Sequence, residues 1–359
     1  MTDPTSTSEA PVSESAVDPA AASAASKGSR TGETLHANVF DSPKERVIRY
    51  ALGACALVSI LTTLGIAAVL VVESAAFFQE VSIGEFLGST QWTPQFADKH
   101  FGIWPLIAGT VLITVISALV SMPLGLASAI YLSAYAPVWL RKWLKPGIEL
   151  LAGVPTVVYG YFALTFVTPL LQTALPHVAP VFYEAYAFVL RLLPFVSPPT
   201  EPWTGDLGVF NALSAGIVVG IMVIPMVASL SEDAIQAVPR SLWNGAYALG
   251  ATKLEVVMRV VVPSAFSGIV ASFILALSRA IGETMIVTLA AGATPKLTLD
   301  PTESIQTMTA FIVQMGKGDI AQSTIEYKSL FAVGLVLFLI TLGMNILANR
   351  IVARYQDKY

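Results

Sequence analysis

Arg279 and Glu283 carry opposite charges four residues apart, inside an apolar stretch of the chain. A charged side chain near the centre of a membrane helix costs at least about 2.5 to 3.5 kcal/mol, so something must offset both charges. A guanidinium offers several hydrogen-bond donors to an oxyanion, and a nearby carboxylate can accept a hydrogen bond only from an anion that still carries a proton. Hydrogen phosphate meets both conditions, whereas sulfate near neutral pH has no proton to donate.

One face of the helix predicted around these charges is small or polar. Helical spacing places on it Ser272, Ala276, Arg279, Gly282 and Glu283. We therefore expect this face to point into a helix bundle and predict a solute pathway lined by Arg279, Glu283, Ser272 and Thr284. A self-neutralising pair of Arg279 and Glu283 that only fixes helix packing is the alternative.

A second pattern lies in the polar segment 231–263, which carries the signals of two short helices. Gly250 can end the first helix, because glycine is common just beyond a helix C-terminus. Thr252, followed three residues later by Glu255, is typical of a capping box that opens the second. Pro263 ends that helix before the next apolar stretch. The segment is predicted to form a helix-turn-helix between two membrane spans.

The elements that must position these residues are membrane helices. Of the 359 residues, 55% are hydrophobic and 12% charged, against roughly a quarter charged in soluble globular proteins. Each bilayer crossing needs about 20 mostly apolar residues. We predict an all-α integral membrane protein whose transmembrane domain, 41–359, has six spans, at about 50–72, 103–134, 146–171, 208–230, 264–291 and 329–348.

The positive-inside rule orients these spans. Most Lys and Arg residues fall in the N-terminal tail, the 135–145 loop, the 231–263 loop and the C-terminus. The opposite face receives only Lys99, Arg191, Lys296, Lys317 and Lys328. The prediction is a multi-pass protein with both termini and the 231–263 loop in the cytoplasm.

The remaining segments carry less chemistry. Residues 1–40 have no apolar run and are predicted to form a disordered cytoplasmic tail, and 181–193 is too short to cross a bilayer and is expected to lie at the interface. None of the histidines (His36, His100 and His177) falls in a span, so no metal site is predicted, and no cofactor or nucleic acid is expected. The chain has no phosphate-binding loop of the Gly-x-x-x-x-Gly-Lys-Ser/Thr kind, so ATP hydrolysis must belong to a partner rather than to this chain.

The 231–263 loop resembles the cytoplasmic loop signature of bacterial ABC import permeases. The residues that match its spacing are Asn244, Gly245, Ala246, Gly250 and Pro263. Asn244 stands where that signature has glutamate, and Gly245 where it has alanine, so a salt bridge made by the glutamate in relatives is not carried over. The resemblance implies that this loop docks into an ATPase subunit and transmits its closure.

Residues 279–285 are similar to a motif of the phosphate-specific ABC transporter permeases of the PstC type, and further matches occur at 92–94, 101–110 and 153–160. The resemblance covers the chain from about residue 45 to its end. It implies a permease in the bacterial cytoplasmic membrane that carries phosphate. It also implies a heterodimer with a second, related permease, two ATPase subunits and an extracytoplasmic phosphate-binding protein.

Three other interpretations remain open. Within the transporters, the solute could be another oxyanion, such as sulfate or molybdate. A secondary transporter or channel would need no ATPase, but the glycine-centred loop would then have no role, and no internal repeat is evident. A membrane enzyme is the weakest alternative, because the sequence offers no catalytic constellation.

Overall fold

The computed structural model describes residues 43–177, 183, 207–318, 320–321 and 324–355. The predicted tail, 1–40, and most of the 172–208 segment, including the predicted interfacial stretch, lie outside these residues. The chain divides into two compact units, 1–68 and 69–359. Helix α2, Pro43–Phe78, begins in the first unit and ends in the second.

Helices are the regular elements in the described part of the second unit, together with one isolated antiparallel bridge between Trp92 and Phe101. Its α-helices are, in chain order, α3 (Ile83–Gly88), α4 (Trp104–Ile130), α5 (Val138–Ala152), α6 (Thr156–Phe162), α8 (Ala212–Gln236), α9 (Arg240–Ala248), α10 (Lys253–Glu255), α11 (Val262–Ser264), α12 (Phe266–Ile281), α13 (Met285–Ala290), α14 (Met308–Lys317) and α15 (Ile325–Tyr355). Three π-helical turns extend them: η2 (Tyr131–Tyr135), η3 (Ala163–Val167) and η4 (Val256–Val261).

Five helices of the described residues are long and apolar enough to cross a membrane, and a sixth span forms if one bent pair counts as a single crossing. The five are Glu45–Phe78, Trp104–Tyr135, Thr156–His177, Ala212–Gln236 and Ile325–Arg354. The bent pair, Lys253–Ser264 and Phe266–Ile281, turns by 70° at Ala265. The all-helical fold agrees with the prediction, and the six predicted spans are reached if the bent pair counts as one crossing. Trp104–Tyr135 is one long apolar helical segment despite Pro123 inside it.

The third span begins later than predicted. Pro146, its predicted first residue, lies inside α5, and the break comes at Gly153 to Pro155. A residue before proline is pushed away from helical dihedrals, so the helix cannot continue through Val154. The long apolar helix starts at Thr156, and α5 is a separate amphipathic helix on the chain before it.

The fifth span is also not one continuous helix. α12 ends at Ile281, and α13 restarts at Met285. Between them, the Glu283 carboxylate accepts hydrogen bonds from backbone N–H groups of the new helix. A side-chain oxygen that satisfies these otherwise unpaired donors starts a helix instead of continuing the previous one.

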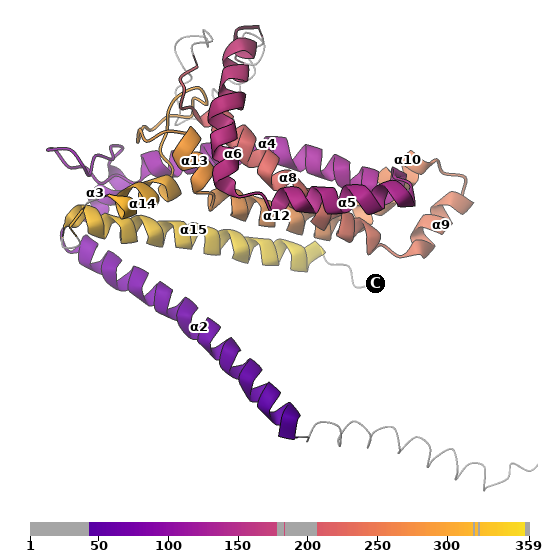
Figure 1. Ribbon diagram of the computed structural model, residues 1–359. Coiled ribbons are helices and arrows are strands. Elements are labelled where there is room, and N and C mark those ends of the chain that lie inside the picture. The colour runs from indigo at the N-terminus through magenta and orange to yellow at the C-terminus, as the bar shows by residue number, and fades with distance from the viewer. Residues whose placement is uncertain (1–42, 178–182, 184–206, 319, 322–323, 356–359) are drawn as a thin grey trace, which may run out of the picture. The chain divides into compact units, whose positions relative to one another are not determined.

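α4 and α8 form the centre of the second unit, where they lie side by side (Figure 1). Glycines allow this close approach. A Cβ added to Gly216 of α8 would lie 2.7 Å from Ile116 of α4, and one added to Gly125 of α4 would lie 2.6 Å from Val227 of α8. Small residues at such crossings let helix backbones pack closely where lipid offers no hydrophobic driving force between helices.

Three apolar clusters follow one another along this bundle. The central cluster joins α4, α8, α12 and α13 around Val219 and Ile286. At one end, α3, α14 and α15 pack around the edge-to-face rings of Trp92 and Phe311, whose centroids are 5.0 Å apart. At the other end, the helices of the 231–263 loop pack on α4, α8 and α12 around Trp243.

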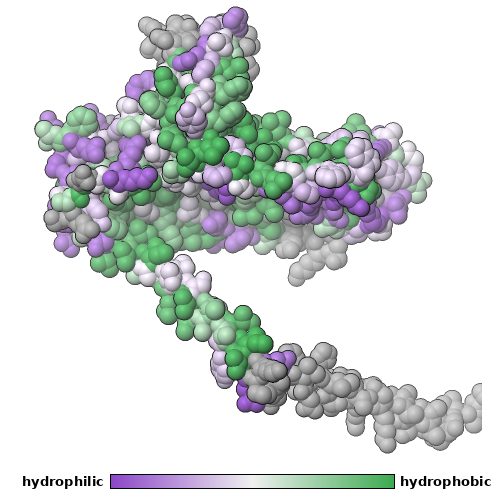
Figure 2. All heavy atoms as spheres, in the orientation of Figure 1, coloured by the Kyte–Doolittle hydropathy of each residue, from purple (hydrophilic) through white to green (hydrophobic). Residues whose placement is uncertain are grey.

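Large apolar side chains nevertheless remain exposed on several helices of the second unit. On α6 and η3 they include Val158, Tyr161, Phe162 and Phe166. Figure 2 shows hydrophobic surface over the region that α6 occupies in Figure 1. Exposed apolar helix faces of this extent are typical of a protein whose solvent is lipid or whose faces meet other membrane subunits.

Candidate functional site

The break between α12 and α13 places Glu283 differently from the prediction. Its side chain is 8% exposed, and Oε1 accepts hydrogen bonds from the backbone N–H groups of Met285 at 3.1 Å and Ile286 at 3.2 Å. The hydroxyl of Thr309, from α14, donates to the backbone carbonyl of Glu283 at 2.7 Å. Glu283 therefore caps α13 and joins α12, α13 and α14 at one point.

Arg279 does not pair with Glu283. It lies in the last turn of α12, on an exposed position, and its guanidinium makes no hydrogen bond or ion pair within the described part of the chain. The alternative, a self-neutralising pair one helical turn apart, is not formed, because Glu283 lies beyond the end of α12. The preceding residue, Ser278, donates a hydrogen bond to the Asn345 side chain of α15 at 3.2 Å and so joins the last turn of α12 to α15.

Ser272 and Thr284, the other two residues of the predicted pathway, lie in different surroundings. Ser272 is 1% exposed, and its hydroxyl lies 2.7 Å from that of Ser231 in α8, so it packs α12 against α8. Thr284 is half-buried at the break, where its hydroxyl donates to the carbonyl of Gly282 at 3.1 Å. Arg279, Glu283 and Thr284 thus gather around the break, and Ser272 lies in helix packing.

The 231–263 loop folds as the predicted helix-turn-helix. α9 ends at Ala248, and Gly250 follows with φ +81°, a conformation that favours glycine. The capping box is present: Thr252 Oγ1 accepts from the N–H of Glu255, and Glu255 Oε2 accepts from the N–H of Thr252 at 2.9 Å. Pro263 lies in α11, just before the 70° bend into α12.

The loop has a buried side and an open side. Trp243 is buried, and Leu242 and Ala246 pack with it on the apolar cluster at the ends of α4, α8 and α12. Asn244 and Gly245 are exposed on α9. Leu249, just beyond the last residue of the helix, is 91% exposed. The open side therefore offers a polar surface on α9, and the loop also exposes the apolar side chains of Leu249, Leu254 and Met258.

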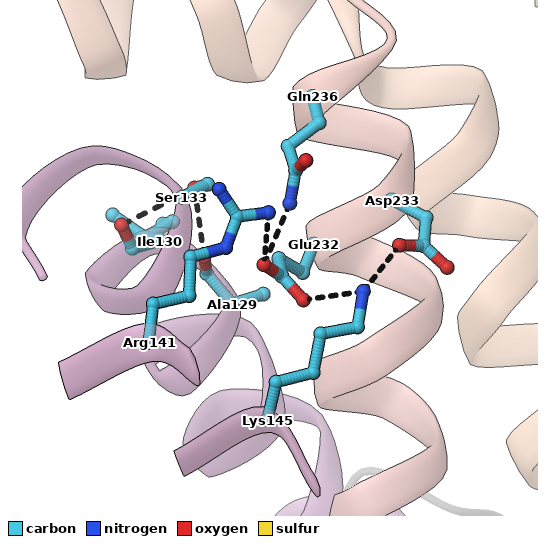
Figure 3. Close-up of polar contacts among 8 residues, drawn as sticks. All are labelled: Ala129, Ile130, Ser133, Arg141, Lys145, Glu232, Asp233 and Gln236. Atoms are coloured by element: carbon cyan, nitrogen blue, oxygen red, sulfur yellow. Dashed lines mark hydrogen bonds and ion pairs between the residues drawn. The ribbon is translucent and has the colours of Figure 1, made fainter. Parts of the chain in front are cut away.

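Figure 3 shows a buried charge cluster, at the foot of this loop, that the sequence reasoning did not identify. Glu232, in the last turns of α8, has a side chain only 2% exposed. Its Oε1 lies 2.7 Å from Arg141 and accepts from Gln236 at 2.6 Å, while Oε2 lies 3.0 Å from Lys145. Lys145 also contacts Asp233, whose side chain is 59% exposed, at 2.8 Å.

The signal for this cluster was present in the sequence. Arg141 and Lys145 were counted as evidence for membrane orientation, and Glu232 was placed at the start of a loop. Residues four apart on a helix share a face, so Arg141 and Lys145 can contact the same carboxylate. Their common partner, however, is about 90 residues further along the chain, and spacing alone does not predict such a contact.

The sequence of this chain is similar to those of known transport proteins. Residues 121–357 match the family described as binding-protein-dependent transport system inner membrane component. The chain is 34% identical over 308 residues to the probable ABC transporter permease protein YqgH of Bacillus subtilis, covering 84% of this chain and 90% of that protein. It is also 34% identical to the phosphate transport system permease protein PstC of Xylella fastidiosa (strain Temecula1), over 276 residues that cover 76% of this chain and 80% of that one.

Solved structures support the fold. A chain from the crystal structure of a bacterial alginate ABC transporter, in complex with an alginate pentasaccharide-bound periplasmic protein, aligns with a TM-score of 0.54 at 15% identity. The alignment covers 87% of this chain and 96% of that one. The chain belongs to the family of binding-protein-dependent transport system inner membrane components, and it is a permease subunit of an ABC importer in the bacterial inner membrane, not an enzyme.

Proposed function

We propose that this permease carries inorganic phosphate into the cell. The observation that carries the proposal is the identity to PstC proteins, which spans most of both chains. The chemistry of the α12–α13 break supports it, since a guanidinium and a carboxylate lie within five residues of each other at a helix interruption. Interrupted membrane helices commonly mark the solute sites of transport proteins, because the freed polar groups can face the solute.

Arg279 supplies the positive charge in this proposal. Because its guanidinium is exposed and has no partner in the described residues, it is available to a group that the isolated chain lacks. An unpaired charge at membrane depth is expensive unless it faces protein or a water-filled cavity. Its position is accounted for if the second permease completes a polar cavity on this face of α12, into which phosphate passes.

Glu283 acts as a fixed acceptor at the same break. Oε1 is held by two backbone N–H groups of α13, which leaves Oε2 to accept the proton of hydrogen phosphate. A carboxylate cannot make this contact with sulfate, which has no proton near neutral pH. Repulsion between the carboxylate and the anion also keeps binding weak enough for release, as conduction requires.

The open side of the 231–263 loop is the surface that we assign to the ATPase. Asn244 and Gly245 are exposed on α9, and Leu249 projects at the turn. Two ATPase subunits would engage this loop and the equivalent loop of a second, related permease. An extracytoplasmic phosphate-binding protein would deliver the solute at the opposite end of the bundle, which contains α3 and α14. Both termini would lie in the cytoplasm.

Phosphate uptake in a strain without other phosphate importers tests the proposal. The chain is expressed with its partner subunits, and assembly is checked by co-purification. Arg279→Gln should abolish uptake without loss of assembly, because glutamine keeps hydrogen-bonding ability and loses the charge. Arg350→Gln, which removes an equally exposed arginine from the neighbouring α15, should transport like the unsubstituted chain.

Three results would contradict this proposal. Normal uptake by an assembled Arg279→Gln complex would remove Arg279 from the pathway. Equal competition by sulfate or molybdate would favour a general oxyanion permease over a phosphate permease. Uptake that persists after ATP depletion would instead indicate secondary transport.

A further inference from the structure

Helix α5 differs from the other long helices of the second unit in how it is attached. None of its residues is buried, and it contributes no residue to the apolar clusters of the described chain. Trp139, Trp143 and Leu150 point away from the protein, with exposures of 67%, 78% and 76%. Apolar packing therefore does little to hold α5 in place.

The charge cluster around Glu232 is what joins α5 to α8. Arg141 and Lys145 contact Glu232 from one face of α5, and both carboxylate oxygens are engaged (Figure 3). A buried carboxylate is tolerated only when charges and hydrogen bonds compensate for its lost hydration. Separation of α5 from α8 would leave that carboxylate without its cations, so the two helix segments are held together by the charge of Glu232.

The start of α9, around Trp243, is held to the end of α8 by apolar packing. Ile235 and Val238, at the end of α8 and just after it, share an apolar cluster with Trp243 of α9. Lys253 of α10 also lies over the ring of Tyr135, the last residue of η2, 4.8 Å from its centroid. The end of α8 is therefore fixed to the 231–263 loop on one side and to α5 on the other.

Beyond α5 the contacts continue to the α12–α13 break. The hydroxyl of Tyr159, in α6, donates to the carbonyl of Leu151 in α5 at 3.0 Å across the break between those helices. Gly160 of α6 packs so closely on α13 that an added Cβ would lie 2.8 Å from Leu289. α13 is the helix whose first turn Glu283 caps.

We propose that Glu232, Arg141 and Lys145 form an ion clamp that makes α5 move together with the start of α9. A displacement of the 231–263 loop then also displaces α6 and α13. These are positioning residues, and they do not touch the solute. The proposal rests on the loop's proposed role as the ATPase contact. It adds a route from that contact to the helix break, carried by charges instead of apolar packing.

Spin labels on the exposed positions Lys142→Cys of α5 and Ser241→Cys of α9 test the clamp in the assembled complex, in a Cys55→Ala background. The distance between the labels is measured without nucleotide and with ATP plus vanadate. With the clamp intact, one narrow distance distribution should persist in both states, because the two helices move together. Glu232→Gln should lose that narrow distribution, most clearly in the nucleotide-bound state.

Asp233→Asn is the matched control, because Asp233 is the adjacent carboxylate on the same helix and contacts the same lysine while 59% exposed. It should keep the narrow distribution. Should Glu232→Gln prevent assembly, Arg141→Gln is the milder variant, since Lys145 still neutralises Glu232, and it should also broaden the distribution. A narrow distribution in both assembled variants, or a broad one in the unsubstituted complex, would overturn the clamp.

This readout does not depend on which solute is carried. Failure of phosphate uptake in the unsubstituted complex would refute the proposed function and leave the distance measurement valid. In complexes that do transport, Glu232→Gln should raise the amount of ATP hydrolysed per solute imported, and Asp233→Asn should leave that ratio unchanged.

Discussion

Replacement of Gly250 by valine should uncouple ATP hydrolysis from transport. Gly250 forms the turn between α9 and the capping box at Thr252, with φ +81°. No heavy atom lies within 4 Å of the position that a Cβ would occupy. An added Cβ therefore meets no atom of this chain, and the strain within the chain comes from the backbone conformation.

The size of that effect follows from the left-handed conformation. A residue with a Cβ loses about 1 to 2 kcal/mol there relative to its favoured dihedrals, and a β-branched residue is among the least tolerant. A loss of that size changes the ratio of folded to unfolded turn by about 5- to 30-fold. Because the turn is exposed, we expect the strain to be relieved by local rearrangement of the loop, with the membrane helices intact.

Two variants make the experiment specific. Gly250→Asn should restore most of the coupling, because asparagine tolerates the left-handed region better than other residues with a Cβ. Gly245→Ala, in an equally open place within α9, should keep coupling although Gly245 lies on the surface assigned to the ATPase, because alanine is the residue that the import-permease signature has there; it should also stabilise the helix by about 1 kcal/mol. ATP hydrolysis and uptake are measured on the same reconstituted complexes. Normal coupling by an assembled Gly250→Val complex would refute the assignment of this loop to the ATPase.

Three further predictions concern packing, topology and pH. Gly216→Leu should destabilise the complex by about 1 to 3 kcal/mol through collision with Ile116, whereas Gly147→Ala, with open space around it, should not; thermal unfolding in detergent measures both, and equal stability would contradict the packing. In a Cys55→Ala background, an impermeant thiol reagent applied from outside should label Lys317→Cys and not Asn244→Cys, and the reverse pattern would invert the proposed orientation. Hydrogen bonding to Asp233 raises the pKa of Lys145 above 10.5, so the contribution of this lysine to stability should stay constant from about pH 6 to 9 and be lost only as the pH rises through that raised pKa. Loss of this contribution near pH 8 in thermal unfolding would contradict the raised pKa.

The membrane fold could be predicted because lipid imposes strict requirements on a sequence. The apolar stretches at 50–72 and 329–348 fall within α2 and α15, and 208–230 overlaps α8, which begins at Ala212, since length and hydropathy decide which segments can cross. The loop helices were predicted for a similar reason. Gly250 and the Thr252–Glu255 capping box act through bonds between residues close in sequence, so their effect can be read locally.

The prediction was wrong where hydrogen bonds, packing and a proline break override simple helical spacing. Helical spacing placed Arg279 and Glu283 on one face of a continuous helix. The Glu283 carboxylate instead accepts hydrogen bonds from the N–H groups of Met285 and Ile286, where a new helix begins. Ser272 has the spacing of a pathway residue, yet Ser231 of α8 buries it. The start of the third span moved because Pro155, and not Pro146, interrupts the chain.

The sequence by itself determined the class of protein, the number of spans and the helix-turn-helix, because each depends on composition or on residues within one or two helical turns. Only the tertiary structure decided that Arg279 has no partner in the described chain and that Glu232 has two cations. The physical reason is that an uncompensated charge away from water is costly, so a buried carboxylate such as Glu232 is stable only where the packing brings opposite charges near it. For Glu232 those charges come from α5, and the packing of α5 against α8 was not predictable from the spacing of either helix alone.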